Sequence, residues 1–394
     1  MSKHTYFSGQ PILTQLLKLI PRSEVNRLAM GYQADRYCKR FFTWDHVVSM
    51  LFACLSDCQS LREITTGMLA AEGKLRHAGL ASTPRRSTLA EANSRRDQAL
   101  FGDLYHHLLN RFYPDSRQGF QVVDSTTISL FSDVLANAGR AGSDGRRKGG
   151  VKVHTMMSHA HQIPSFVVLS AASRHDSPFL KEVPLTPGSL VCFDKGYWDY
   201  ALFERWSQPD EQVWFVTRLR ANAVVHPEAH RCVPEEERAA GVLADRVARL
   251  GHPATGQVQP RVRLIEYCDE VTRRQFTFVS NSMSLSALEI AQIYRRRWTV
   301  ELLFKRIKGA YPLKYFLGES VNAIKIQLWS ILICDLLISV LQQRCRRRWS
   351  YRGLRSMIRL HLLSYVDLRG FLTDPTKALL QAQNKPTKPP DLFD

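Results

Sequence analysis

The sequence predicts a mixed α/β domain that follows an all-helical N-terminal domain. Apolar residues recur at helical spacing over residues 11–112, and no strand pattern interrupts them. From Gln118 onward, short runs rich in β-branched residues alternate with helical stretches, which is typical of an α/β domain. The 394 residues, 44% of them hydrophobic, are enough for two or three domains with buried cores.

The N-terminal domain is expected to span residues 1–117. Helical spacing is clearest in 12–20, 47–55 and 100–112. Two capping boxes predict helix starts, Ser60 with Glu63 and Thr88 with Glu91, because each side chain can satisfy the other residue's free backbone N–H.

Six strand candidates define the α/β domain, which we expect to begin at residue 118. They are 119–123, 151–157, 165–169, 189–193, 213–216 and 275–279, with a helical stretch at 198–206. Their alternation with helices predicts a mixed sheet. Residues 221–274 have a looser texture of Pro, Gly and charged residues, and we interpret them as an insertion within this domain.

A helix over residues 287–308 is marked at both ends. Ser286 and Glu289 form a capping box at its start, and Gly309 followed by Pro312 closes it. The apolar stretch 324–341 is nearly long enough to span a membrane. It carries Lys325, Gln327 and Asp335, which are costly in lipid, so we expect a core helix. Residues 346–394 are expected to form a basic C-terminal segment that ends in a disordered tail.

The charge of the chain points to a polyanionic partner. Lys and Arg number 54 against 36 Asp and Glu, which gives a formal net charge of +18. Such basicity in a chain with buried cores favours nucleic acid as the partner, although a basic soluble surface is the simpler alternative. Four arginines of the N-terminal domain suit either a DNA-binding helix-turn-helix or a solvated helix face, namely Arg85, Arg86, Arg95 and Arg96.

The sequence disfavours a secreted or membrane-anchored protein, and it disfavours a zinc site built from cysteines. The start of the chain lacks the apolar segment of a secretory signal, so a cytoplasmic protein without a membrane anchor is expected. The eight cysteines are scattered and form no zinc-binding pattern with each other or with histidines, so they are expected to be reduced thiols.

The strongest chemical signal lies on the predicted helix 287–308. At 100° per residue, Tyr294, Arg297, Glu301 and Lys308 point within about 60° of one another. Apolar residues cover most of the remaining circumference, which indicates a helix packed on several sides. An intrahelical ladder from Arg297 to Glu301 is the structural alternative to a functional cluster.

Two further carboxylates, Asp124 and Asp194, each end an apolar strand. Active sites of α/β sheets gather at such strand ends. Together with Glu301 they would supply hard oxygen ligands, which select Mg²⁺ or Mn²⁺, and two such ions about 4 Å apart can drive an in-line phosphodiester displacement. Taken alone, either aspartate is better explained as the cap of a turn.

The spacing Tyr294-x2-Arg297-x3-Glu301-x6-Lys308 resembles the YREK signature of DDE transposases of bacterial insertion sequences, specifically insertion-sequence family four. The aspartate contexts, Val123-Asp124-Ser125-Thr126 and Phe193-Asp194-Lys195-Gly196-Tyr197, agree with that family. The resemblance covers residues 118–345, and the helical N-terminus is also similar to members of the family.

The resemblance implies an RNase H-like catalytic domain over 118–345, interrupted by an insertion domain at about 221–274. It implies that Asp124, Asp194 and Glu301 hold two Mg²⁺ ions, with Mn²⁺ as a substitute. The expected activity is cleavage of double-stranded DNA at the ends of an insertion sequence and joining of the 3′-OH to target DNA through a hairpin intermediate. A homodimer on paired ends and a location on the bacterial nucleoid are also implied.

Several residues are expected to contact this DNA. Tyr294, Arg297 and Lys308 would hold phosphates near the cut, and Trp298 or Trp198 would offer an aromatic platform to a flipped base. The basic loop with Arg146, Arg147 and Lys148 is placed to contact the backbone, although any solvated turn has this composition. Aromatic residues are also more often part of a core.

His175-Asp176 follows the third strand. The pair fits support of a metal site or a helix cap at Asp176, and the cap is the favoured interpretation. Two alternative functions also remain open, a catalytically silent DNA-binding regulator and a stand-alone metal-dependent nuclease. A silent descendant is expected to lose an acidic residue, and none is lost.

Overall fold

The structure is a computed structural model that describes residues 9–129, 140–141, 147–148, 150–173, 175–252, 254, 258–311, 313 and 315–383. The chain divides into two compact units, unit 1 with residues 1–112 and 307–394, and unit 2 with residues 113–306. Arg146 and the predicted disordered end of the tail lie outside the described residues. The division differs from the predicted one, because residues 307–345 group with the N-terminal helices.

Unit 1 is helical, which confirms the predicted class of the N-terminal region. Its N-terminal helices are α1 (Ile12–Leu17), α2 (Arg22–Gly31), α3 (Thr43–Leu55), α4 (Leu61–Ala70), α5 (Glu72–Leu75), the 3₁₀ turn η1 (Arg76–Ala78), α6 (Arg86–Arg95) and α7 (Ala99–Phe112). Its C-terminal helices are α13 (Val321–Arg344), α14 (Tyr351–Leu360), α15 (Leu368–Thr373) and α16 (Pro375–Gln383). The two stretches join directly, since the Leu13 N–H donates to the Leu362 carbonyl over 2.8 Å.

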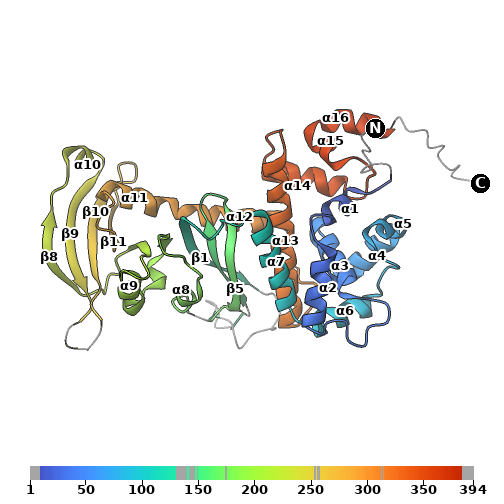
Figure 1. The fold of residues 1–394 in the computed structure, drawn as a ribbon, viewed down its shortest axis with the longest axis horizontal. Helices are drawn as coiled ribbons and strands as arrows, with labels where there is room; N and C mark the ends of the chain where they lie inside the picture. Colours follow the sequence, from blue (N-terminus) through green and yellow to red (C-terminus); the bar gives the residue numbers. More distant parts are fainter. Residues whose placement is uncertain are drawn as a thin grey trace, which may run out of the picture. The chain divides into compact units, whose positions relative to one another are not determined.

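The long helix α13 is the core of unit 1, as predicted for the apolar stretch. It contacts α3 and α7, and Figure 1 shows it beside these helices. By length and composition it could cross a membrane, yet 89% of its most apolar window is buried within the protein. Its buried Gln327 accepts from the Leu317 N–H and donates to the Tyr315 carbonyl. Gly102 of α7 lets the Trp329 ring of α13 approach, because a Cβ there would lie 3.0 Å from the ring.

One of the two predicted N-terminal caps is present. The Glu63 N–H donates to Ser60 Oγ over 3.2 Å at the start of α4. The cap predicted at Thr88 is wrong, because the N-cap residue of α6 is Arg85, three positions earlier. The Leu89 N–H already donates to the Arg85 carbonyl over 3.1 Å, so Thr88 lies inside the first turn of the helix.

Unit 2 is built on one mixed nine-stranded sheet in the order β5-β4-β1-β6-β7-β11-β10-β9-β8. The strands are β1 (Phe120–Ser129), β4 (Gly150–Ser158), β5 (Ile163–Ala171), β6 (Leu190–Phe193), β7 (Trp214–Arg218), β8 (Val225–Arg231), β9 (Val242–Leu250), β10 (Arg261–Cys268) and β11 (Gln275–Ser280). The pairs β1–β6 and β6–β7 are parallel and the others are antiparallel. The mixed sheet is therefore confirmed, and a separate two-stranded ribbon joins β2 (Arg140–Ala141) to β3 (Arg147–Lys148).

The segment predicted as an insertion extends this same sheet. It contains β8, the short helix α10 (Glu235–Ala239), β9 and β10, and β10 pairs along its length with β11. Figure 1 shows β8, β9, β10 and β11 as consecutive yellow to orange arrows. The segment thus adds strands beyond β11, at one edge of the sheet.

Helices cover both faces of the central strands. On one face Val123, Phe193 and Phe215 share a core with α8 (Phe179–Glu182) and α9 (Tyr200–Trp206). On the other face Cys192 and Val216 share a core with α11 (Ala287–Arg296). Successive strand residues point to opposite faces, so Asp124, after Val123, and Asp194, after Phe193, both lie on the α11 face.

Candidate active site

The two predicted aspartates lie side by side at the end of a parallel strand pair. The last paired position of β1 and β6 joins Val123 to Phe193. Asp124, within β1, and Asp194, directly after β6, are therefore the next residues beyond this parallel pairing, and the common pleat turns both toward the same face. The prediction that the first strand ends at Asp124 is wrong, because its antiparallel pairing with β4 continues to Ser129. The Ser125 N–H donates to Asp124 Oδ1 over 2.8 Å, and the Gly196 N–H donates to Asp194 Oδ2 over 3.3 Å. Local backbone donors thus orient both carboxylates.

The helix that faces them is divided into two. The predicted helix 287–308 consists of α11 and α12 (Trp298–Ala310), and the prediction of one continuous helix is wrong at Arg297. There the Arg297 N–H bonds to the Tyr294 carbonyl and the Val300 N–H to the Arg297 carbonyl, three residues apart instead of four. The capping box is confirmed, since the Glu289 N–H donates to Ser286 Oγ and the Ser286 N–H to Glu289 Oε2.

Arg297 joins carboxylates from two distant parts of the chain. Its Nη1 lies 3.1 Å from Asp124 Oδ2, and its Nη2 lies 2.8 Å from Glu301 Oε1. The side chain is only 16% exposed. Tyr294 donates its hydroxyl to Asp194 Oδ1 over 3.4 Å. The predicted ladder from Arg297 to Glu301 is present, but a strand-end aspartate shares its cation.

Burial dominates the electrostatics of this cluster. It raises the pKa of Asp124 to about 6, against the opposing effect of Arg297, and nearby Asp194 and Glu301 add to the rise. Burial also raises the pKa of Tyr294 to about 12. Although burial opposes it, the charge of Asp124 raises the pKa of Arg297, so this side chain stays a cation.

The donor set has the chemistry of a divalent-cation site. Asp124, Asp194 and Glu301 offer carboxylate oxygens, the ligands that Mg²⁺ and Mn²⁺ prefer. In the described part of the chain, these residues do not form a ready three-ligand cluster. Arg297 instead holds two of the three carboxylates, so one cation compensates the charges that a metal ion would otherwise compensate. The residues fit the ion in kind and charge.

A cavity of about 590 Å³ adjoins this cluster in unit 2. Asp194, Tyr294 and Arg297 of the cluster line it. Its remaining walls combine aromatic, basic and acidic side chains, among them Tyr267, Phe276, Phe278, Trp298, Arg218, Arg274, Arg295, Asp269 and Glu270. Sequence reasoning missed all of these except Trp298, because they come from β7, β10, β11, the turn between β10 and β11, and α11, and meet only through the sheet pairing.

A family model described as a transposase DDE domain matches residues 115–337, more than half of the chain. The chain belongs to the DDE transposase family. A second model, of a domain of unknown function designated DUF4372, matches residues 8–81. The resemblance to transposases of bacterial insertion sequences is thus confirmed. The residues matched by the transposase model include Asp124, Asp194 and Glu301.

Curated relatives of the transposase carry the same family name. It is 28% identical over 265 residues to the putative transposase y4zB of Sinorhizobium fredii, covering 66% of this chain and 72% of the relative. It is 26% identical to a probable transposase for the element IS5377 of Geobacillus stearothermophilus, over 58% of each chain. It is 24% identical to a putative transposase for the element IS4SA of Synechocystis, over 65% of this chain and 71% of the relative.

A solved structure of the piggyBac transposase synaptic complex with hairpin DNA is also similar to the transposase. The alignment covers 100% of this chain and 89% of that one, with a TM-score of 0.46 and 10% identity.

The other predicted residues of the transposase are placed as follows. Trp298 lines the cavity and is 59% exposed, whereas Trp198 is buried and packs edge-on against Phe203, so Trp198 belongs to the core. Lys308 lies in the part of α12 that groups with unit 1, and burial lowers its pKa. Arg147 and Lys148 form β3.

The favoured interpretation of Asp176 as a helix cap is wrong. The N-cap residue of α8 is Pro178, and Asp176 Oδ1 instead accepts hydrogen bonds from Ser125 Oγ and Lys152 Nζ. Both donors lie on strands of the central sheet, and Ser125 directly follows Asp124.

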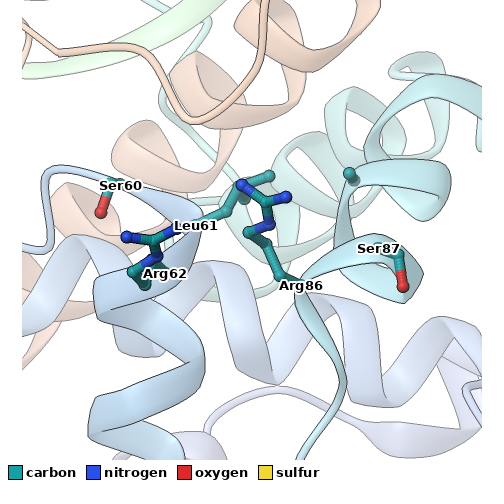
Figure 2. Close-up of a pocket in the computed structure, with 6 residues that line it drawn as sticks. Ser60, Leu61, Arg62, Arg86 and Ser87 are labelled. Carbon is teal, nitrogen blue, oxygen red and sulfur yellow. The ribbon is translucent and has the colours of Figure 1, made fainter.

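Unit 1 of the transposase has a basic cavity of its own, of about 420 Å³. It lies between the first turns of α4 and α6 and is lined by Ser60, Leu61, Arg62, Arg86, Ser87 and Ala90 (Figure 2). Arg62 and Arg86 are exposed, and neither forms an ion pair with any described residue. Arg86 is one of the arginines for which the sequence leaves a DNA contact and a solvated helix face open, and Arg62 is not among them.

Proposed function

We propose that the chain is an active transposase that cuts phosphodiester bonds at the ends of an insertion sequence and joins the 3′-OH to target DNA. The observation that carries the proposal is the meeting of Asp124, Asp194, Arg297 and Glu301 on one face of the sheet. The first two directly follow the last parallel pair of β1 and β6, and Arg297 ties the third carboxylate to Asp124. All three acidic residues are retained, which argues against a silent regulator.

Asp124, Asp194 and Glu301 would hold two Mg²⁺ ions, for which Mn²⁺ can substitute. Bound there, such ions supply an activated oxygen nucleophile and stabilise the leaving oxygen. The protein's part is to hold the three carboxylates close together. Arg297 holds Asp124 and Glu301 in the free protein. On substrate its guanidinium would exchange a carboxylate for two phosphate oxygens, which it can bind in bidentate fashion.

The DNA contacts of the proposal use the remaining predicted residues. Tyr294 and Lys308 would hold phosphates near the cut, and Arg146, Arg147 and Lys148 would contact the backbone. Trp298 lines a cavity with other aromatic and charged side chains and is 59% exposed, which supports its role as a platform for an unstacked base.

In unit 1, Arg62 and Arg86, which form no ion pair with a described residue, would bind a backbone phosphate in their cavity (Figure 2). The helical N-terminal domain would then contribute to DNA binding, as its composition predicts. This role would also give the domain that matches the DUF4372 model a function in the transposase.

The wider proposal follows the family. Unit 2 would be an RNase H-like catalytic fold in which residues 221–274 are the insertion. The protein would act as a homodimer on paired ends of double-stranded DNA, through a hairpin intermediate, in the bacterial cytoplasm and on the nucleoid. Relatives named for insertion-sequence elements support this assignment.

The decisive experiment is a Mg²⁺-dependent assay on DNA that carries the ends of the element encoding this chain. The native protein should cleave these ends and yield a joined or hairpin product. Asp124→Asn and Glu301→Gln should bind the same DNA with native affinity and leave it uncut, because each substitution replaces a carboxylate by a neutral amide of the same size and shape.

Glu289→Gln is the matched control, since Glu289 lies on α11 but only caps it. It should cleave like the native protein. Cleavage without any joined product would favour a stand-alone nuclease. Binding without cleavage by the native protein would overturn the proposal in favour of a regulator.

A further inference from the structure

A buried polar cluster lies on the reverse side of the sheet, directly behind Asp124. Register pairs Ser125 with His154 and Thr127 with Lys152, so these side chains share the face opposite to Asp124. Asp176 closes the cluster from the loop after β5. Its Oδ1 lies 2.8 Å from Ser125 Oγ and 3.1 Å from Lys152 Nζ.

The burial of this cluster shows that it is a fixed part of the fold. The Lys152 side chain is 5% exposed and that of His154 is 1% exposed. His154 stacks on Phe179 and shares a hydrogen bond with Ser170 Oγ, so the walls of the cluster are packed on both sides. A buried lysine needs an anionic partner, and Asp176 supplies it.

The same loop also reaches the second aspartate. A Cβ at Gly196 would lie 3.8 Å from both Asp176 Oδ2 and Asp194 Oδ2, so the two carboxylates approach the same glycine. Ser177 donates its hydroxyl to the Trp198 carbonyl over 3.3 Å, which ties the Asp176 loop to the turn after Asp194. One short segment thus contacts residues that follow each of the two aspartates, Ser125 after Asp124 and Trp198 after Asp194.

We propose that Asp176 is a positioning residue for the acidic site, acting on Asp124 through Ser125. Ser125 is held at two points, since its N–H donates to Asp124 Oδ1 and its Oγ donates to Asp176 Oδ1. Fixing the hydroxyl therefore fixes the peptide that orients the carboxylate. Asp176 is not itself expected to be a metal ligand, because Oδ1 already accepts from two donors.

This inference rests on the proposed function and predicts a change in metal affinity that a purely structural role does not predict. Partners that orient a ligand typically change metal affinity 10- to 100-fold. Asp176→Ala and Ser125→Ala should each weaken Mn²⁺ binding about tenfold. Because both variants remove the same hydrogen bond, from Ser125 Oγ to Asp176 Oδ1, their effects should not add in the double variant. Asp176→Asn keeps an acceptor oxygen for Ser125 and should recover most of the affinity.

The test is a titration of the full-length protein with Mn²⁺ alone, without DNA, in which free Mn²⁺ is followed by electron paramagnetic resonance. Thermal unfolding in EDTA provides the folding control, and Ser125→Ala leaves the ion pair with Lys152 intact should Asp176→Ala fold poorly. The matched control is Asp199→Ala. Asp199 also pairs with a lysine, Lys181, but only caps α9, so its loss should lower the melting temperature without changing Mn²⁺ affinity.

Native Mn²⁺ affinity in both Asp176→Ala and Ser125→Ala would overturn the positioning role. Additive losses in the double variant would also overturn it, because they would mean two separate effects. A native protein that binds no Mn²⁺, and whose Asp124→Asn variant behaves identically, would instead overturn the proposed function itself.

Discussion

At the scale of single residues, Arg297 is the side chain that pairs with two of the three carboxylates of the site. One guanidinium compensates Asp124 from β1 and Glu301 from its own helix pair, at 3.1 and 2.8 Å. Both carboxylates are largely shielded from water, so the ion pairs are stronger than those of an exposed ladder. The side chain therefore has a structural role in the free protein and a phosphate-binding role in the proposed reaction.

Arg297→Ala should slow cleavage by about 100-fold or more, the typical cost of losing an electrostatic contact to the reacting group. Its free energy of unfolding should fall by about 3 kcal/mol, because Asp124 is left largely buried without its cation. Single-turnover cleavage and chemical denaturation of the same variant check the two values.

Arg297→Lys is the control, because it keeps the charge but not the forked geometry. It should fold normally and cleave poorly. A collapse of stability in Arg297→Ala that accounts for all the lost cleavage would show that the ladder is purely structural.

A buried histidine should make unit 1 sensitive to acid. Burial lowers the pKa of His46 to about 3, with a further contribution from Arg96, while its Nε2 bonds to Asn93 over 2.8 Å. In the unfolded chain His46 therefore binds a proton below about pH 6.5, whereas in the folded chain it stays neutral down to about pH 3. The free energy of unfolding therefore falls as the pH drops from 6.5 toward 3.

His46→Gln should reduce this loss by about 2 kcal/mol at pH 5, because glutamine cannot protonate in that range. Denaturation at pH 7 and pH 5 measures it, with exposed His77→Gln as the matched substitution. An equal acid response of native and His46→Gln proteins would contradict the buried-neutral assignment.

At the scale of elements, the added strands β8, β9 and β10 are linked to the helix of the active site. Arg263 of β10 is 1% exposed, pairs with buried Asp245 of β9, and donates to the carbonyls of Ser282 and Leu285 just before α11. The start of α11, which carries Tyr294 toward Asp194, is thereby fixed to the sheet.

Arg263→Met should lower the free energy of unfolding by about 3 kcal/mol, because it leaves the buried Asp245 with only the partly exposed Arg231, 3.5 Å away, as its cation. Chemical denaturation of the full chain tests this. Arg261→Met, on the same strand but with an exposed ion pair, should change stability by no more than about 0.5 kcal/mol. Equal effects of the two substitutions would show that Arg263 does not fix the start of α11 to the sheet.

The elements also show what a sequence can predict. The strand end at Asp194 and the cap at Ser286 were visible because a few adjacent residues determine them. The pairing of β1 with β6, the added strands and the aromatic cavity were not, because register between distant segments depends on packing. The strand end predicted at Asp124 was wrong, because pairing with β4 carries β1 on to Ser129. The helix break at Arg297 was missed because its residues have ordinary helix propensity, and it is their tertiary contacts that differ.

At the scale of the whole molecule, the net charge of +18 should govern how the protein binds DNA. Affinity for duplex DNA should fall by about 10³-fold between 50 and 200 mM salt if six or more phosphates are contacted. Fluorescence anisotropy over a salt series measures this. A flat salt response would mean that the charge is not used on DNA.

The cavity of unit 1 makes a sharper prediction within that experiment. Arg62→Gln and Arg86→Gln should each reduce the slope of log affinity against log salt by about 1. Arg27→Gln removes the same charge from unit 1, but Arg27 is paired with Glu24, so its slope should stay native. Equal slopes for all three variants would exclude the cavity as a phosphate site.

The division of unit 1 between the two ends of the chain sets an order of events on the ribosome. Unit 2, residues 113–306, is synthesised and can close its sheet before α13 exists. The N-terminal helices must wait for α13, because this helix supplies the core against which α3 and α7 pack. A nascent transposase therefore carries its acidic cluster before the helical unit is complete, and an interrupted translation product would leave α3 and α7 without their central partner.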